Sequence, residues 1–343
     1  MNPATAPNNN GSGRKKAWIA AARPRTLPLA LSSILLGSFL AASHGGFRWA
    51  VFLLCVLTTI CLQILSNLAN DYGDSIHGAD SLDRQGPVRA VQSGEISLKE
   101  MKNAVILFSC LSLVFGLILL WVALNGQGLI ILGFLALGLL CIYAAVTYTN
   151  GKNPYGYAGF GDISVFLFFG VVGVCGTFYL HTGTFNYLLL LPAAACGLLS
   201  TGVLNINNIR DIESDEKAGK RSIPVRIGGT AARFYHLMLL LGSLVLSALY
   251  VYLTYRDWQQ YVFLIVSPLF ALNAFLVFTR QDAKKLDPLL KQMALSTLLF
   301  VLVFGLGDLI TSGLPPVEIP DQPKQSASSP PSRQIHAPEP NWR

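Results

Sequence analysis

The chain has 343 residues, of which 52% are hydrophobic and only 13% are charged, and its formal net charge is +7. Soluble domains carry about 25% charged residues, so this composition excludes an ordinary soluble protein. The positive charge does not indicate nucleic-acid binding, because the basic residues gather beside apolar segments, where they set membrane orientation and can bind phosphate groups.

The chain begins with a polar segment rich in Asn and Gly, residues 1–16, which we expect to be disordered and cytoplasmic. Apolar segments long enough to cross a hydrocarbon layer of about 30 Å follow. The sequence predicts nine spans, near residues 27–43, 49–66, 103–124, 127–148, 162–180, 186–204, 234–254, 260–279 and 292–312. Residues 17–313 therefore form one polytopic domain, whereas the Pro-rich tail, residues 314–343, cannot bury enough apolar surface to fold.

The basic residues between the spans indicate the orientation of the chain in the membrane. Most of them fall on one side, beginning with Arg14, Lys15 and Lys16 ahead of the first span, while the short loops of the other side offer only Arg48 and Arg256. Because Lys and Arg favour the cytoplasmic side, we predict a cytoplasmic N-terminus and a C-terminus on the opposite side.

The second predicted span ends in an acidic motif, Asn67-Leu-Ala-Asn70-Asp71-Tyr-Gly-Asp74. If the helix continues through this motif, Asn67 and Asp71 are four residues apart, as are Asn70 and Asp74. Side chains at that spacing are neighbours on one helix face. The motif therefore predicts a surface of carboxylate and amide oxygens at the cytoplasmic end of the span.

A second acidic motif follows the sixth span, with the sequence Asn205-Ile-Asn207-Asn208-Ile-Arg210-Asp211-Ile-Glu-Ser-Asp215. Asn207 and Asp211 are four residues apart, and so are Asp211 and Asp215. The two motifs are offset by four spans, which indicates a duplicated four-helix unit with a ninth helix added.

Carboxylates at the ends of membrane helices are costly to leave unpaired. Oxygen ligands of this kind suit Mg²⁺, which takes one or two carboxylates and completes its coordination with water and substrate phosphates. Two such surfaces facing each other would hold a diphosphate between them. Capped and solvated helix ends would explain either motif alone, but they explain two motifs on one face of the membrane less well.

Basic residues near the motifs favour a phosphate-bearing substrate, because arginine and lysine stabilise the negative charge of a departing diphosphate. Positive-inside topology alone would explain any one of them. The candidates are Arg84 and Arg89 after the first motif, Arg210, Lys220 and Arg221 in and after the second, and Lys152, which follows Tyr148 in the loop after the fourth span.

The two motifs resemble the aspartate-rich motifs of the UbiA superfamily, the intramembrane aromatic prenyltransferases. Two strings, Arg23-Pro-Arg-Thr-Leu-Pro28 and Asn67-Leu-Ala-Asn-Asp-Tyr-Gly-Asp74, are more similar to the menaquinone-pathway branch, whose acceptor is 1,4-dihydroxy-2-naphthoate. The resemblance covers residues from about 18 to 312 and leaves out the two polar termini.

The resemblance implies an all-α integral membrane protein of the bacterial cytoplasmic membrane, with nine transmembrane helices around a central cavity. The cavity would open to the cytoplasm for the aromatic acid and laterally to lipid for the prenyl chain. The implied reaction transfers a polyprenyl group from polyprenyl diphosphate to 1,4-dihydroxy-2-naphthoate with loss of CO₂.

The resemblance also implies roles for individual residues. Either Arg23 or Lys152 would hold the carboxylate of the acceptor. The implied Mg²⁺ ligands are Asp71, Asp74, Asp211 and Asp215. The substrate-binding residues that we expect are Asn67, Asn70, Asn207, Asn208, Arg23, Arg84, Arg89, Lys152, Tyr148, Arg210, Lys220 and Arg221.

Three alternatives share part of this pattern. Transfer to 4-hydroxybenzoate, homogentisate or haem would keep the metal chemistry and change the acceptor. An ion-coupled transporter would place its carboxylates near the middle of the membrane, whereas these motifs fall at helix ends. A membrane phosphatidyl-alcohol transferase typically gathers its aspartates in one compound motif.

Overall fold

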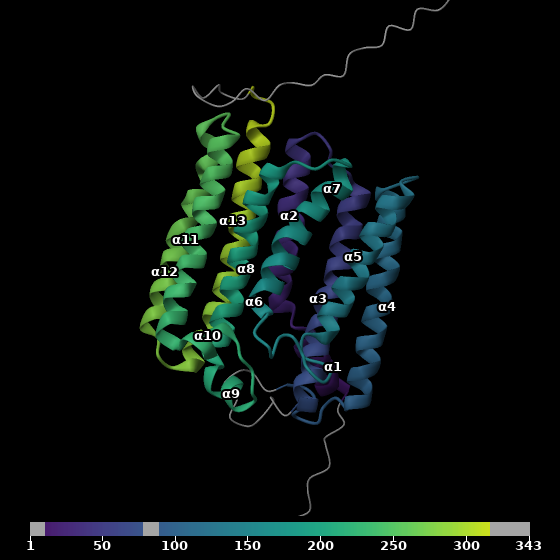
Figure 1. Ribbon diagram of the computed structural model, residues 1–343, viewed down its shortest axis with the longest axis vertical. Helices are drawn as coiled ribbons and strands as arrows, with labels where there is room; N and C mark the ends of the chain where they lie inside the picture. The colour runs from purple at the N-terminus through teal and green to yellow at the C-terminus, as the bar shows by residue number, and fades with distance from the viewer. Residues whose placement is uncertain (1–10, 78–88, 316–343) are drawn as a thin grey trace, which may run out of the picture.

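The computed structural model describes residues 11–77 and 89–315. This part of the chain is helical and has no strands. Within it, nine helical segments are long and apolar enough to cross a membrane. Both the all-α fold and the predicted number of spans are therefore confirmed (Figure 1).

The spans differ in how many helical pieces they contain, because several include 3₁₀ or π-helical segments. The first four are built from α1 (Gly11–Ala22), the 3₁₀ turn η1 (Pro24–Thr26), α2 (Leu27–Ser43), α3 (Trp49–His77), α4 (Leu98–Ala123) and α5 (Gly128–Thr147). The fifth and sixth comprise α6 (Gly161–Val165), the π-helical η2 (Phe166–Gly176), α7 (Thr177–Thr182), η3 (Tyr187–Leu189) and α8 (Leu190–Arg210). Two short helices, α9 (Ile212–Lys217) and α10 (Ile223–Ile227), follow the sixth span. The last three spans comprise α11 (Gly229–Leu253), then η4 (Trp258–Val266) with α12 (Ser267–Thr279), then η5 (Ala283–Leu286) with α13 (Asp287–Thr311).

Several helices run further than hydropathy predicts, and they do so at the end that carries the acidic motifs. The second span continues to His77, the sixth to Arg210, and the ninth begins at Ala283. Hydropathy detects the part of a helix that lies in hydrocarbon, whereas backbone hydrogen bonding continues into the polar region beyond it. Helix α1 likewise begins at Gly11, inside the segment expected to be disordered, and residues 1–10 lie outside the described part.

The long helices stand in two groups, side by side, and several shorter helices lie at one end of the bundle. In Figure 1, α3, α4 and α5 stand on one side of the bundle and α11, α12 and α13 on the other. Helices α1, α9 and α10 lie at one end, and α13 finishes at the opposite end. Both acidic motifs therefore lie at the same end of the bundle, as the sequence predicts.

The order of neighbouring helices recurs between the two halves. Helix α3 packs on α2 and α4, and α4 packs on α5; in the second half, α8 packs on η2 and α11, and α11 packs on α12. This recurrence fits the duplicated four-helix unit. Helix α13 packs against α2 and so joins the last span to the first.

Glycines allow the central helices to approach closely, as is common where membrane helices pack. A Cβ on Gly37 of α2 would lie 2.5 Å from the carbonyl oxygen of Val174, and one on Gly170 of η2 would lie 2.6 Å from that of Ala193. Helix η2 is thereby fixed between α2 and α8. Two of its aromatic residues, Phe168 and Phe169, line the cavity that is described next.

Candidate active site

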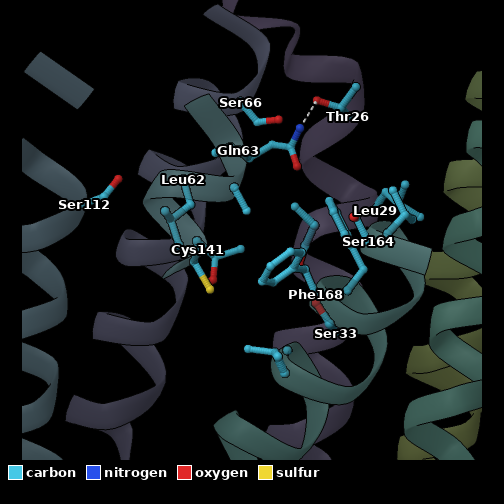
Figure 2. A pocket seen from close by; sticks show the side chains of 18 of the residues that line it. Thr26, Leu29, Ser33, Leu62, Gln63, Ser66, Ser112, Cys141, Ser164 and Phe168 are labelled. Atoms are coloured by element: carbon cyan, nitrogen blue, oxygen red, sulfur yellow. Dashed lines mark hydrogen bonds between the residues drawn. The ribbon is translucent and has the colours of Figure 1, made fainter. Parts of the chain in front are cut away.

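A cavity of about 480 Å³ lies among α2, α3, α4, α5, η2, α8 and α13. Most of its wall is apolar, with side chains such as Leu62, Leu120, Phe134 and Phe168. In Figure 2, Cys141 and Phe168 lie on opposite sides of this space, and Gln63 reaches toward Thr26. Polar and charged side chains of the acidic motifs also line it. The cavity therefore joins charged groups to a larger apolar volume.

Arginines hold the first motif in place. Asp71 accepts a hydrogen bond from Arg23, and Arg89 Nε lies 3.5 Å from the same carboxylate oxygen. Arg89 Nη1 also lies 2.6 Å from Asp74 Oδ2. Both carboxylates are buried, with 2% of each residue exposed. Each carboxylate of the first motif therefore has a guanidinium partner at the end of α3.

A glycine brings the loop after α5 against this motif. A Cβ on Gly73 would lie 2.6 Å from the backbone oxygen of Thr149, so only glycine lets the two backbones meet. The hydroxyl of Thr149 then donates to Asn70 at 3.3 Å. Further along the loop, the Tyr157 hydroxyl donates to Asp74 Oδ1 at 2.7 Å. Burial and the neighbouring Asp74 raise the pKa of Tyr157, which keeps this hydroxyl protonated as a donor.

The second motif keeps its helical spacing across the end of α8. The backbone N–H of Asp211 donates to Asn207 at 3.1 Å, and that of Asp215 donates to Asp211 at 2.8 Å. Arg210 Nε and Nη2 donate to the two oxygens of the Asp211 carboxylate at 2.8 and 2.6 Å. The backbone of the second motif therefore has the helical i to i+4 hydrogen bonds on which the predicted proximity of Asn207, Asp211 and Asp215 depends.

Arg210 also connects the second motif to α13. Its Nη1 donates to Asp287 at 2.6 Å, and its Nη2 donates to the side-chain oxygen of Asn207 at 2.8 Å. Asp287 in turn accepts a hydrogen bond from Arg25 at 3.1 Å. The Arg210 side chain is only 1% exposed, and its charge is balanced by the buried carboxylate of Asp211 and the half-buried one of Asp287.

Lys220 joins the two motifs. Its Nζ lies 3.6 Å from Asp74 Oδ1 and 3.4 Å from Asp215 Oδ1, and it also stands 5.0 Å from the centre of the Tyr157 ring. The carboxylates of Asp74 and Asp215 therefore face one cation from opposite halves of the chain. Burial raises the pKa of Asp215, and the positive charge of Lys220 opposes that rise.

The structure brings many of the predicted site residues to the cavity and leaves others away from it. Tyr148 lines the cavity, and burial raises its pKa. Lys152 and Arg221 are exposed and do not line it. Arg84 lies outside the described residues. The other predicted residues that line the cavity are Arg23, Asn67, Asn70, Asp74, Arg89, Asn207, Asn208 and Lys220, and those that stand behind its wall are Asp71, Arg210, Asp211 and Asp215.

Sequence reasoning missed several residues of the site. Tyr157 and Asp287 bind motif residues, and Arg25 and Lys291 line the cavity. Arg25 could have been found from the sequence, because it belongs to the Arg-Pro-Arg string on which the family resemblance rests. Asp287 and Lys291 gave none, because nothing in their sequence indicates that the start of α13 packs beside α8.

The chemistry of the donor set fits a divalent cation such as Mg²⁺. The site offers carboxylate and amide oxygens, which are hard ligands, and the ammonium of Lys220 already stands between two of the carboxylates. Among the described residues, no three His, Cys, Asp or Glu side chains converge into a ready-made metal site. The Asp residues instead pair with arginine and lysine side chains.

Residues 30–304 match the UbiA prenyltransferase family. The chain belongs to this family. It is 46% identical over 297 residues to a 1,4-dihydroxy-2-naphthoate octaprenyltransferase of Haemophilus influenzae, covering 86% of this chain and 96% of the relative. A protein of the same name in Escherichia coli is 47% identical, covering 86% and 95%. This UbiA-family chain is therefore a prenyltransferase, a multi-pass protein of the inner membrane.

Solved structures of UbiA homologues share the fold. A homologue from Aeropyrum pernix matches with a TM-score of 0.58 at 19% identity, covering 84% of this chain and 98% of the other. A homologue from Archaeoglobus fulgidus, bound to DMAPP and Mg²⁺, matches with a TM-score of 0.55 at 20% identity, covering 86% and 99%. These matches establish that the UbiA-family helical fold extends over most of the chain.

The contacts of Arg210 predict that lysine cannot replace it. A single ammonium cannot span Asp211, Asn207 and Asp287 together, so Arg210→Lys loses at least one charge-assisted hydrogen bond, worth about 1.5–3 kcal/mol. We expect a fall of several degrees in the thermal unfolding midpoint of the detergent-purified protein. Arg280→Lys, at a half-buried residue whose side chain bonds only a backbone carbonyl, is the control and should leave the midpoint unchanged. Equal midpoints for the two variants would contradict the bridging role of Arg210.

Proposed function

We propose that this prenyltransferase transfers a polyprenyl group from polyprenyl diphosphate to 1,4-dihydroxy-2-naphthoate with loss of CO₂, which yields demethylmenaquinol for menaquinone biosynthesis. One observation carries the proposal: Lys220 joins the two acidic motifs beside a cavity that is mostly apolar. A charged site of this kind suits a diphosphate, and the apolar volume suits a prenyl chain. The names of the Haemophilus influenzae and Escherichia coli relatives support this acceptor.

The residues that would hold Mg²⁺ are the motif carboxylates, Asp71, Asp74, Asp211 and Asp215. When bound, the metal supplies positive charge to the leaving diphosphate and so lowers the barrier to its departure. The Archaeoglobus fulgidus homologue bound to DMAPP and Mg²⁺ supports a metal-dependent reaction in this fold.

The basic residues that now pair with the carboxylates would serve the diphosphate. Arg23, Arg89 and Lys220 line the cavity and lie within 4 Å of motif carboxylates. As the allylic C–O bond breaks, negative charge grows on the diphosphate oxygens, and cations held at this position stabilise it more than they stabilise the bound substrate. Amide side chains such as Asn207 and Asn208 would add hydrogen bonds from α8.

The apolar wall would protect the allylic cation from water. Side chains such as Phe134 and Phe168 supply no nucleophile, so the acceptor ring is the group that reacts. The ring carbon that bears the carboxylate forms the new C–C bond. The bond to the carboxylate carbon then breaks, its electron pair returns to the ring, and CO₂ leaves, which restores aromaticity.

The proposal includes an orientation in the bacterial inner membrane. The end of the bundle with α1, α9 and α10 would face the cytoplasm, where the water-soluble aromatic acid is available. The Lys and Arg residues in the loops of that end support this orientation. The end of α13 would then face the opposite side.

The proposed reaction can be tested with the purified protein in detergent. The assay contains Mg²⁺, an allylic prenyl diphosphate, and equal concentrations of 1,4-dihydroxy-2-naphthoate and 4-hydroxybenzoate. We expect prenylated product from the naphthoate alone, CO₂ in equal amount, and loss of both on addition of EDTA. Product from the benzoate would reassign the acceptor, and a prenylated naphthoate that kept its carboxylate would contradict the decarboxylative step.

Substitution of the motif aspartates tests the metal and diphosphate roles. Asp71→Ala and Asp211→Ala should each lower turnover at least about 100-fold, the scale of losing electrostatic stabilisation of the transition state. Glu213→Gln is the matched control, because Glu213 is an exposed carboxylate between Asp211 and Asp215 and does not line the cavity. Near-normal turnover in both aspartate variants, with folding verified by circular dichroism, would refute the proposed site.

A further inference from the structure

The cavity has more basic residues than its carboxylates need. Among the described residues, five cations line it: Arg23, Arg25, Arg89, Lys220 and Lys291. Arg23, Arg89 and Lys220 pair with carboxylates of the acidic motifs, and Arg25 pairs with Asp287. Lys291 makes no ion pair with any residue that the structure describes.

Each aspartate of the two acidic motifs, and Asp287, is matched by a basic residue other than Lys291. In the described part of the chain, Asp71, Asp74 and Asp215 are matched by Arg23, Arg89 and Lys220. Asp211 and Asp287 are matched by Arg210 and Arg25. Lys291 adds one positive charge that these carboxylates do not neutralise, so the wall of the cavity at α13 favours an anion.

The location of Lys291 is set by α13. It lies one helical turn after Asp287, and its neighbours Leu290 and Ala294 also line the cavity. Helix α13 packs against α2 and α8, and Asp287 at its start bonds Arg25 and Arg210, which fixes this stretch at the cavity wall. Lys291 is an exposed residue of this wall whose helix neighbours there are apolar, whereas the arginines that pair with the first motif lie next to carboxylates.

The two substrates of the proposed reaction carry different anions. In the proposed reaction the diphosphate would bind the arginine and lysine side chains that pair with the motif carboxylates, where a divalent cation would also bind. The aromatic acceptor carries a single carboxylate on a flat apolar ring, and it needs one cation beside apolar surface. Neither residue expected for this carboxylate from the sequence meets that need, because Arg23 stands with the motif carboxylates, where it would serve the diphosphate, and Lys152 lies away from the cavity.

We propose that Lys291 binds the carboxylate of the aromatic acceptor and selects for acceptors that carry one. This inference rests on the proposed prenyl transfer and assigns its acceptor site. The ammonium of Lys291 donates to the carboxylate, while the ring lies against the apolar wall beside Leu290 and Ala294. Such a charge-assisted hydrogen bond positions the ring carbon that bears the carboxylate.

A steady-state comparison of Lys291→Gln with the unsubstituted protein tests the assignment. We expect the KM for 1,4-dihydroxy-2-naphthoate to rise about tenfold or more and the KM for the prenyl diphosphate to stay unchanged. Lys291→Arg should recover most of the loss, because it keeps the charge. Lys284→Gln, at an exposed lysine that does not line the cavity, is the matched control and should leave both KM values unchanged.

An acceptor analogue without a carboxylate separates charge recognition from a general structural effect. The dissociation constants of 1,4-dihydroxy-2-naphthoate and 1,4-naphthalenediol are measured on both proteins. Lys291→Gln should weaken only the naphthoate. Equal weakening of the two ligands, or a selective rise in the KM for the prenyl diphosphate, would overturn the assignment. Because binding is measured without turnover, a failure of the proposed reaction is distinguishable from a failure of the acceptor site.

Discussion

The ion pairs of Lys220 with Asp74 and Asp215 are the contact on which the site depends. The two carboxylates come from opposite halves of the chain and are buried, Asp74 near the end of α3 and Asp215 in the short helix α9 after α8, where an unpaired charge would be costly. A shared cation removes that cost and draws the halves together. Exchange of this cation for a divalent metal would keep the carboxylates charged, so the resting site and the loaded site satisfy the same electrostatic constraint.

The cavity combines two environments that the proposed reaction needs together. Charged groups of α3, α8 and the adjoining loops would favour departure of a diphosphate, and the apolar wall formed by α4, α5 and η2 would exclude water from the allylic cation. Close helix packing maintains this arrangement. Gly73 admits the loop that carries Tyr157, and Gly37 and Gly170 hold η2 against its neighbours. Small residues in this fold therefore determine where the reactive groups stand.

Hydropathy and motif spacing predicted the spans, the common end of the two motifs and the helical spacing of Asp211 and Asp215. They did so because helix periodicity and membrane thickness act locally along the chain. Sequence did not predict which cation meets which carboxylate. Lys152 follows Tyr148 by four residues yet lies away from the cavity, whereas Lys291 lines it from a distant part of the chain. Such placements depend on how α13 packs against α2 and α8, and no local pattern encodes that packing.

A structure of the protein with Mg²⁺ and a thiodiphosphate analogue of the prenyl substrate, whose C–S bond resists ionisation, tests the central claim most directly. The account predicts a metal ion between Asp74 and Asp215, the Lys220 ammonium moved from the carboxylates to the diphosphate, and the prenyl chain against Phe134 and Phe168. A diphosphate bound away from both acidic motifs, or carboxylates that keep their Lys220 contacts with the analogue bound, would contradict it.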